Sequence, residues 1–337
     1  MHLNKIIALA TLISLISCDP IGSGGYKYNQ GSLPDSPVNL EAFNSQYDDY
    51  NSTAPSFGRL IPFCFSTNRN SLGTTFDVMY QPMNVNFDRT SGILKVTNEY
   101  SNWGIYSADF EIIKNALNKI NTDDNEFGPN LFLNRNSSDS GFDFLLMYAT
   151  DVSGNFEISY TFNKDKSDFT DSKPVKFLNS GSDDLYPTFT SDQSQLYFCS
   201  DRENGNFNIF YVNIDNTNKE MSTVLSDTGI KEVFKDEILS GDYEDKSPYI
   251  FAGMMVFTSN RPGGFGGFDL YYSKQENGKW SAPTNFGSKI NSEYDEYRPI
   301  LFESDVDFER HMMVFSSNRT GGKGGFDLYF AGVKKNL

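Results

Sequence analysis

The stretch TSNRPGGFGGFDLYYS (258–273) decides the fold, because nearly the same residues return at 316–331 as SSNRTGGKGGFDLYFA. Two shorter versions stand at 66–80 (STNRNSLGTTFDVMY) and 199–211 (CSDRENGNFNIFY). In each copy an alternating apolar segment ends at Ser/Thr-x-Asn/Asp-Arg, and a second one begins at Phe-Asp/Asn. This pattern is typical of a β-hairpin. A motif that recurs along the chain predicts a repeated supersecondary unit.

A fifth copy is weaker and allows two alignments. Asn134-Arg135 with Phe142-Asp143 leaves almost no room for the strands that precede the hairpin in the other units. YATDVSGNFEISY (148–160) restores the spacing, with Val152 in place of arginine and Glu157 in place of Asp or Asn. We therefore place the second hairpin at 148–160.

A second signal precedes each hairpin: Asn or Ser, then an acidic pair, then proline, which comes late in the first copy. Its five copies are NSQYDDY (44–50), KINTDDNEFGP (119–129), NSGSDDLYP (179–187), SGDYEDKSP (240–248) and KINSEYDEYRP (289–299). Short strands of period two between Gly, Pro and Asn turns describe four-stranded antiparallel units. Five such units predict an all-β chain folded as a five-bladed β-propeller, with six blades as the alternative.

The two ends of the chain support a closed ring. The last unit stops one strand short at residue 337, while SPVNLEAFNSQYDDY (36–50) mirrors APTNFGSKINSEYDEY (282–297). We expect the N-terminal segment to supply the missing strand of the last blade, which removes exposed sheet edges.

Composition limits the possible partners. The 337 residues are 38% hydrophobic and 15% aromatic, which is ample material for a core. The formal net charge of −16 opposes binding to phosphate backbones, so we predict no nucleic-acid partner.

The N-terminal segment has the features of an export signal. Residues 1–17 carry a short polar start and an apolar run, and Leu15-Ile16-Ser17 before Cys18 resembles the lipobox of bacterial lipoproteins. The resemblance implies acylation of Cys18 and attachment to a membrane through acyl chains. We expect a signal peptide over 1–17, a lipidated cysteine with a tether over 18–35, and the propeller over 36–337. Cys64 and Cys199 lie in apolar runs and are expected to be buried free thiols, with a disulfide as the alternative.

The repeat also resembles a known family. SNRPGGFGGFDLYYS (259–273), followed by KWSAPTNFGSKINSEYDEYRP (279–299), is similar to the WD40-like β-propeller repeat of TolB-type and OmpA-associated envelope proteins, common in lipoproteins of the Bacteroidetes. The resemblance spans about residues 36–337. It implies a propeller in the cell envelope, on an outer-membrane lipoprotein, but no single activity and no particular face of the membrane.

In a propeller, the loops that enter the innermost strands and the second hairpins share one face, so the acidic pairs and the hairpin arginines should meet there. We expect these residues to staple hairpins and blades together, since arginine suits carboxylate pairing. A charged rim that recognises a ligand is the alternative. The repeat-motif residues are Arg69, Asp77, Arg202, Asn208, Arg261, Asp269, Arg319 and Asp327.

Signatures of catalysis are scarce. His2 and His311 are the only histidines, and neither a G-x-S-x-G nucleophile motif nor a calcium loop occurs. We therefore predict no catalytic residue, no bound metal and no cofactor. One partial match remains, because SSDSGFDF (137–144) resembles the Asp-box of sialidase-like propellers with Phe144 in place of tryptophan.

Segments that interrupt the repeat are the best candidates for binding. The first interval contains SADFEIIKNALNKI (107–120), whose apolar residues Phe110, Ile113, Leu117 and Ile120 predict a short helix outside the first blade. Beside it, Tyr100, Trp103 and Tyr106 offer an aromatic platform for sugar or peptide, or else fill the core between blades. Phe265, at the tip of a glycine-rich turn, is expected to be exposed.

These observations predict a lipid-anchored, non-enzymatic propeller that acts as a protein-binding or assembly module of the bacterial envelope. The alternative is a surface propeller that binds or hydrolyses glycans.

Overall fold

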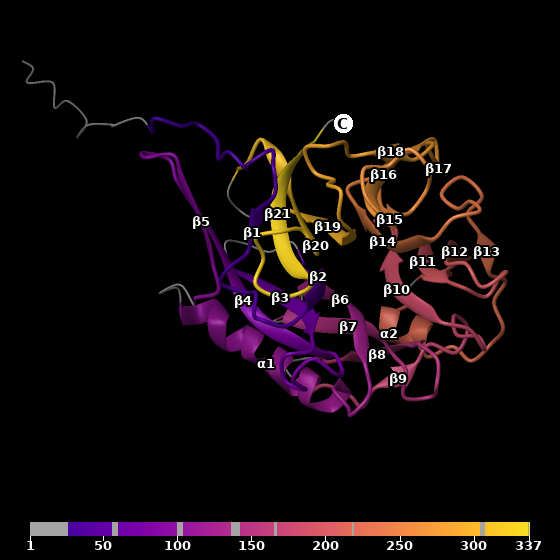
Figure 1. Cartoon of the computed structure of the whole chain (residues 1–337). Coiled ribbons are helices and arrows are strands. Elements are labelled where there is room, and N and C mark those ends of the chain that lie inside the picture. The colour runs from indigo at the N-terminus through magenta and orange to yellow at the C-terminus, as the bar shows by residue number, and fades with distance from the viewer. Residues whose placement is uncertain are drawn as a thin grey trace, which may run out of the picture.

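The computed structural model describes residues 26–55, 60–99, 104–135, 142–164, 167–217, 219–303, 307–335 and 337. Their strands form five antiparallel sheets that follow one another around a common axis (Figure 1). The five-bladed β-propeller is thereby confirmed, and the six-bladed alternative is wrong.

Each blade begins with an innermost strand, and the chain then moves outward. From the axis outward, blade 1 is β2 (Asp49–Thr53), β3 (Leu60–Thr67), β4 (Asp77–Asp88) and β5 (Ile93–Thr97); blade 2 is β6 (Glu126–Arg135), β7 (Phe142–Thr150), β8 (Glu157–Phe162) and β9 (Lys173–Pro174); blade 3 is β10 (Asp184–Phe189), β11 (Gln195–Ser200), β12 (Asn208–Asn213) and β13 (Phe234–Lys235); blade 4 is β14 (Asp245–Phe251), β15 (Met254–Ser259) and β16 (Asp269–Glu276), with β17 (Lys279–Trp280) and β18 (Thr284–Asn285) both on β16; blade 5 is β19 (Glu296–Phe302), β20 (Arg310–Ser317), β21 (Asp327–Lys334) and β1 (Val38–Asn39).

The hairpin of the second unit lies where the spacing argument put it. Strand β7 ends at Thr150, the turn follows, and β8 begins at Glu157, with Thr150 opposite Glu157. The rejected alignment used residues 134–143 as the repeat hairpin between the second and third strands. These residues instead end β6 and begin β7, the first two strands of the blade, with Asn134 opposite Asp143.

Strand β1 closes the ring, as predicted. It pairs antiparallel with β21, and Val38 lies opposite Phe330. Part of the predicted tether also lies on the propeller, since Gly31 bridges to Phe308 and Leu33 is buried. Apolar side chains in this segment find partners there, so ordered chain begins before residue 36.

The acidic pairs join neighbouring blades. At the junction of blades 4 and 5, Asp295 Oδ1 accepts the backbone N–H of Phe268 at 2.9 Å, and the backbone N–H of Glu296 donates to the Phe268 carbonyl at 2.8 Å. The same backbone bond recurs at all five junctions. The Asn or Ser that precedes each acidic pair also forms hydrogen bonds to the neighbouring blade. Asn291, for example, brackets the backbone of Leu270 with both amide atoms.

The predicted helix is present as α1 (Gly104–Ile120), on the outer side of blade 1 (Figure 1). Ile113, Leu117 and Ile120 are buried in a cluster shared with Cys64 and Tyr80. The side chain of Phe110 lies outside the described residues. A second short helix, α2 (Met221–Leu225), follows β12. Within the described part of the chain, no helix combines the length and apolarity needed to cross a bilayer. Cys64 and Cys199 are buried free thiols, as expected.

Every innermost strand carries a bulge where it pairs with the next strand. A bulge bends a strand and redirects the side chain at the extra residue. The residue at each bulge has a positive φ, and we name these five the axial ring: Asn51, Gly128, Tyr186, Ser247 and Arg298.

Candidate functional site

The hairpin arginines are held by contacts within their own blades. Arg261 Nη2 lies 2.6 Å from Asp245 Oδ1 and 2.8 Å from the Leu239 carbonyl oxygen, while Nε donates to Ser259 Oγ at 3.0 Å. The carboxylate is fully buried. Three further pairs repeat this arrangement: Arg69–Asp49, Arg202–Asp184 and Arg319–Glu296. The four arginines are therefore engaged inside the fold rather than presented to a ligand.

The other repeat-motif residues organise the hairpin turns. Asp269 accepts the backbone N–H of Phe265 at 2.7 Å and of Gly266 at 3.0 Å. Asp327 does the same for Lys323 and Gly324. Two members act more locally: Asp77 accepts from Asn70 Nδ2, and Asn208 Nδ2 donates to the carbonyl of Asn206.

Blade 2 lacks its arginine, and this changes one carboxyl group. Glu126 occupies the buried acidic position, but Val152 stands where the other blades have arginine and is exposed. Thr122 Oγ1 and Thr150 Oγ1 donate to Glu126 Oε1 at 2.7 and 3.1 Å. Burial without a cation raises the pKa of Glu126 to about 7, although the threonine hydrogen bonds oppose the shift.

The predicted binding aromatics contribute little to a described site. Tyr100 and Trp103 lie outside the described residues. Tyr106 falls within α1, but its side chain is also outside them. Phe265 is 49% exposed at the tip of its turn. These four residues remain candidates from the sequence alone.

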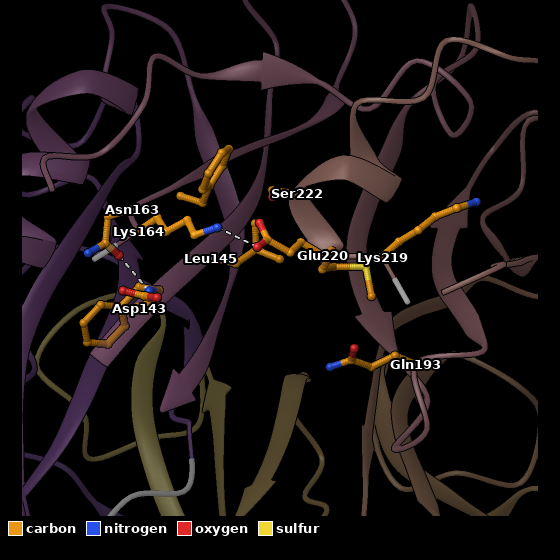
Figure 2. A pocket seen from close by; sticks show the side chains of 11 residues that line it. Asp143, Leu145, Asn163, Lys164, Gln193, Lys219, Glu220 and Ser222 are labelled. Atoms are coloured by element: carbon orange, nitrogen blue, oxygen red, sulfur yellow. Dashed lines mark hydrogen bonds and ion pairs between the residues drawn. The ribbon is translucent and has the colours of Figure 1, made fainter. Parts of the chain in front are cut away.

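A cavity of about 260 Å³ lies between blades 2 and 3 (Figure 2). Its walls stand at the strand ends opposite those that carry the arginine hairpins. Blade 2 contributes the start of β7 and the chain just after β8. Blade 3 contributes the turn before β11 and the start of α2. The lining residues are Asp143, Phe144, Leu145, Phe162, Asn163, Lys164, Gln193, Lys219, Glu220, Met221 and Ser222.

Asn163 is the most informative residue of this cavity. It is only 3% exposed, and its Oδ1 accepts the backbone N–H of Phe144 at 2.7 Å, which fixes the amide plane. Its Nδ2 group has no hydrogen-bond partner. A buried donor without an acceptor is costly, and native proteins rarely leave one unpaired.

An ion pair joins the two blades across the cavity. Lys164 Nζ lies 2.6 Å from Glu220 Oε1, and Figure 2 shows the two side chains pointing toward each other. Lys219 points away and pairs with Asp215 at 2.9 Å, so only its stem lines the wall. The remaining lining combines carboxylate, amide and hydroxyl groups with the apolar side chains of Phe162 and Met221. Such a lining suits a small ligand that carries several hydroxyl groups.

Most of the cavity was not predicted from the sequence. Its walls come from the segments after β8 and β12, where the copies diverge in length and composition, so no repeat marks them. One signal did fall nearby, because the partial Asp-box at 137–144 ends in two lining residues, Asp143 and Phe144. Residues 137–141 of that motif lie outside the described residues.

No family model matches the chain, and no curated protein does. Among solved structures, it is similar to an α-L-arabinofuranosidase from Podospora anserina (10% identity, TM-score 0.48, 91% of this chain and 98% of that chain). It is also similar to the GH43B protein of Bacteroides ovatus (13%, 0.48, 88% and 54%) and to TolB from Acinetobacter baumannii (17%, 0.35, 77% and 63%). At these identities and TM-scores the likeness assigns no activity and no ligand to this chain.

These comparisons correct the function predicted from the sequence. TolB-type propellers are among the similar structures, but glycoside hydrolases are more prominent. The prediction of a non-catalytic protein-binding module, and of no enzymatic activity, is therefore withdrawn, and the glycan alternative is taken up below as a proposal. The missing histidine and serine motifs do not count against the glycan alternative, since glycoside hydrolysis needs only carboxyl groups.

Proposed function

We propose that this protein acts on carbohydrate and that the cavity between blades 2 and 3 holds one sugar residue. The observation that carries the proposal is the buried amide of Asn163, a lining residue of this cavity whose Nδ2 group has no acceptor. A sugar hydroxyl supplies such an acceptor, and Gln193 and Ser222 add polar groups on the opposite wall. The volume lies just below the roughly 300–1,000 Å³ of sites for drug-sized ligands. It suits one ring rather than a long chain.

Hydrolysis of a glycosidic bond belongs to the proposal because two carboxyl groups line the same cavity. Asp143 comes from blade 2 and Glu220 from blade 3. Most glycoside hydrolases use two such groups, one as acid and the other as base or nucleophile. Glu220 is held in place by the ammonium of Lys164, which lies 2.6 Å from its Oε1.

Binding is tested by screening a glycan array and titrating the hits calorimetrically. Asn163→Asp keeps the acceptor that holds Phe144 but replaces the free donor with an acceptor, and Gln193→Ala trims the opposite wall. Each should weaken binding about tenfold or more, as expected when a polar partner is lost. Gln195→Ala is the matched control, since this side chain bonds Asn213 and is not among the lining residues. Equal affinity in all variants, or no saccharide bound at all, would overturn the proposal.

Hydrolysis is tested by reducing-sugar release from the saccharides that bind. Asp143→Asn and Glu220→Gln should each lower turnover by at least two orders of magnitude while both proteins keep the wild-type Tm. Turnover unchanged in both variants would exclude these carboxyl groups as the catalytic pair. Binding without any hydrolysis would leave a recognition site only.

We also propose that the mature chain is anchored to the outer membrane through acyl groups on Cys18. The support is the Leu15-Ile16-Ser17-Cys18 sequence after an apolar run. Metabolic labelling with an alkyne palmitate should mark the wild type and leave Cys18→Ala unmarked and released from membranes. An unlabelled wild-type protein would contradict lipidation.

A further inference from the structure

The axial ring contains a fully buried arginine. Arg298 has no exposed surface, and its guanidinium lies over the rings of Tyr186 at 5.1 Å and Tyr249 at 5.7 Å. Nη1 donates to the carbonyl of Pro248 at 3.0 Å and Nη2 to that of Pro129 at 3.4 Å. These contacts come from blades 2, 3 and 4, so the side chain reaches across the axis from blade 5.

No carboxylate among the described residues pairs with this cation. The four hairpin arginines each have a buried acidic partner, whereas the polar contacts of Arg298 are carbonyl oxygens. Burial lowers the pKa of Arg298 to about 10, so the side chain still carries its charge at neutral pH. A buried charge without a counter-charge is strongly disfavoured.

Several hydrogen-bonding groups around Arg298 also lack partners. Its own Nε, both amide atoms of Asn51 and the hydroxyl of Ser247 are buried and make no well-formed hydrogen bond. Asn51 and Ser247 lie close to the Tyr186 hydroxyl, whose ring stacks on the guanidinium, so these groups share one region of the axis. Arginine, the asparagine amide, serine and tyrosine can all donate here, so an anion among them would find several donors beside the positive charge.

The backbone is held in unfavourable conformations to make this arrangement. Asn51, Tyr186, Ser247 and Arg298 have φ values between 47° and 58°, a region that side chains other than glycine rarely adopt. Gly128 is the exception that makes room, because a Cβ there would collide with the Tyr186 ring. Strain of this kind is concentrated at functional sites.

We propose that the axial ring binds a small monovalent inorganic anion, chloride or a halide of similar size, between Arg298, Asn51 and Ser247. The complete burial of these three residues favours a monatomic ion over a polyatomic or organic one. The anion would neutralise the guanidinium and accept from the three kinds of donor. The site is separate from the cavity between blades 2 and 3, and its failure would leave the carbohydrate proposal untouched.

The test compares the thermal unfolding of the full chain in sodium chloride, sodium bromide and sodium gluconate at equal ionic strength. Chloride and bromide should raise the Tm saturably over gluconate, because the ion binds only the folded state. Ser247→Ala and Arg298→Gln should reduce or abolish the halide effect, and Arg89→Gln, which removes an arginine that lies over Tyr26, should keep it.

Crystals grown in bromide provide a readout that does not depend on the variants folding. An anomalous peak in contact with Arg298 Nε is the expected result. Identical Tm values in all three salts, or an ordered water without anomalous signal beside Arg298, would overturn the proposal and leave the carbonyl oxygens and tyrosine rings as the only compensation for the charge.

Discussion

One amino-acid difference gives blade 2 a property that the other blades lack. In four blades a guanidinium lies against the buried acid, but at Val152 the hairpin offers no cation and Glu126 retains only its threonine donors. No ion pair therefore offsets the unfavourable free energy of burying this carboxyl group. The carboxyl group of Glu126 therefore titrates near neutral pH.

Glu126 should make the fold less stable as pH rises. In the unfolded chain the group titrates near its ordinary pKa of 4.5, and in the folded chain near 7. The folded state therefore binds more protons between these values. The contribution is fully present below about pH 4.5 and is lost as pH rises through 7, by up to about 3 kcal/mol.

Chemical unfolding between pH 4 and 8 checks this expectation in wild type and Glu126→Gln. The difference between the two proteins isolates the group, since burial also raises the pKa of Asp245 and Glu296. Val152→Arg should remove most of the same slope by restoring the cation. Parallel pH profiles of wild type and Glu126→Gln would show that Glu126 does not titrate in this range.

At the residue scale, the sequence predicted positions better than roles. Accepting Val152 in the arginine position gave the correct register for blade 2, and the unpaired state of Glu126 follows from that alignment. Arg298 precedes the proline of its copy, where the other blades have Gly128, Tyr186 and Ser247. This position differs between the copies, whereas the residues around it repeat, and that difference marks the axial ring in the sequence. Its burial at the axis can be seen only in the structure.

At the scale of elements, the glycine-rich hairpins are required by how closely the blades approach. A Cβ on Gly266 would collide with the backbone carbonyl of Tyr294, and a Cβ on Gly324 would collide with that of Tyr47. Each collision is with the backbone of the next blade, so no side chain can move aside. This contact explains why the glycines recur in the two most similar copies.

Gly324→Ala should therefore destabilise the junction between blades 5 and 1. Overpacking of this kind costs about 1–3 kcal/mol, and more where backbone must shift. Gly181→Ala is the control, because no atom lies within 4 Å of its added Cβ. Urea unfolding should give a lower midpoint for Gly324→Ala and an unchanged one for Gly181→Ala. Equal midpoints would mean that the hairpin can withdraw from its neighbour.

Elements that belong to the repeat were predicted from the sequence, and elements that interrupt it were predicted only in part. Helix α1 was predicted from the helical spacing of Ile113, Leu117 and Ile120. The walls of the cavity could not be predicted in this way, because Asn163 and Gln193 lie in segments with neither a repeat nor a periodic pattern. Their meeting depends on two neighbouring blades and cannot be read from either segment alone.

At the scale of the whole molecule, the ring is closed by the N-terminal segment lying on the last blade. Strand β1 adds two residues to β21, and Asn44 reinforces the closure by bracketing the backbone of Leu328 at 2.8 and 2.9 Å. Without them the outer edge of β21 would present unpaired backbone groups, which promote association between chains.

Deleting residues 1–44 should therefore lower the Tm and cause concentration-dependent association, measured by scanning calorimetry and light scattering. Deleting residues 1–25 removes only chain outside the described structure and should leave both unchanged. A monomeric 1–44 deletion with the full Tm would show that closure contributes nothing to stability.

The first and last segments of the propeller meet in blade 5. The folded ring should therefore form equally well from a chain that starts at another blade. A linker joining the C-terminus to residue 36, with a new start cut between β13 and β14, would yield a circular permutant. It would keep all sixteen strand pairings of the described residues, and its chain would begin at blade 4 and end at blade 3. Such a permutant could be displayed or fused from another side of the disc without rebuilding any sheet.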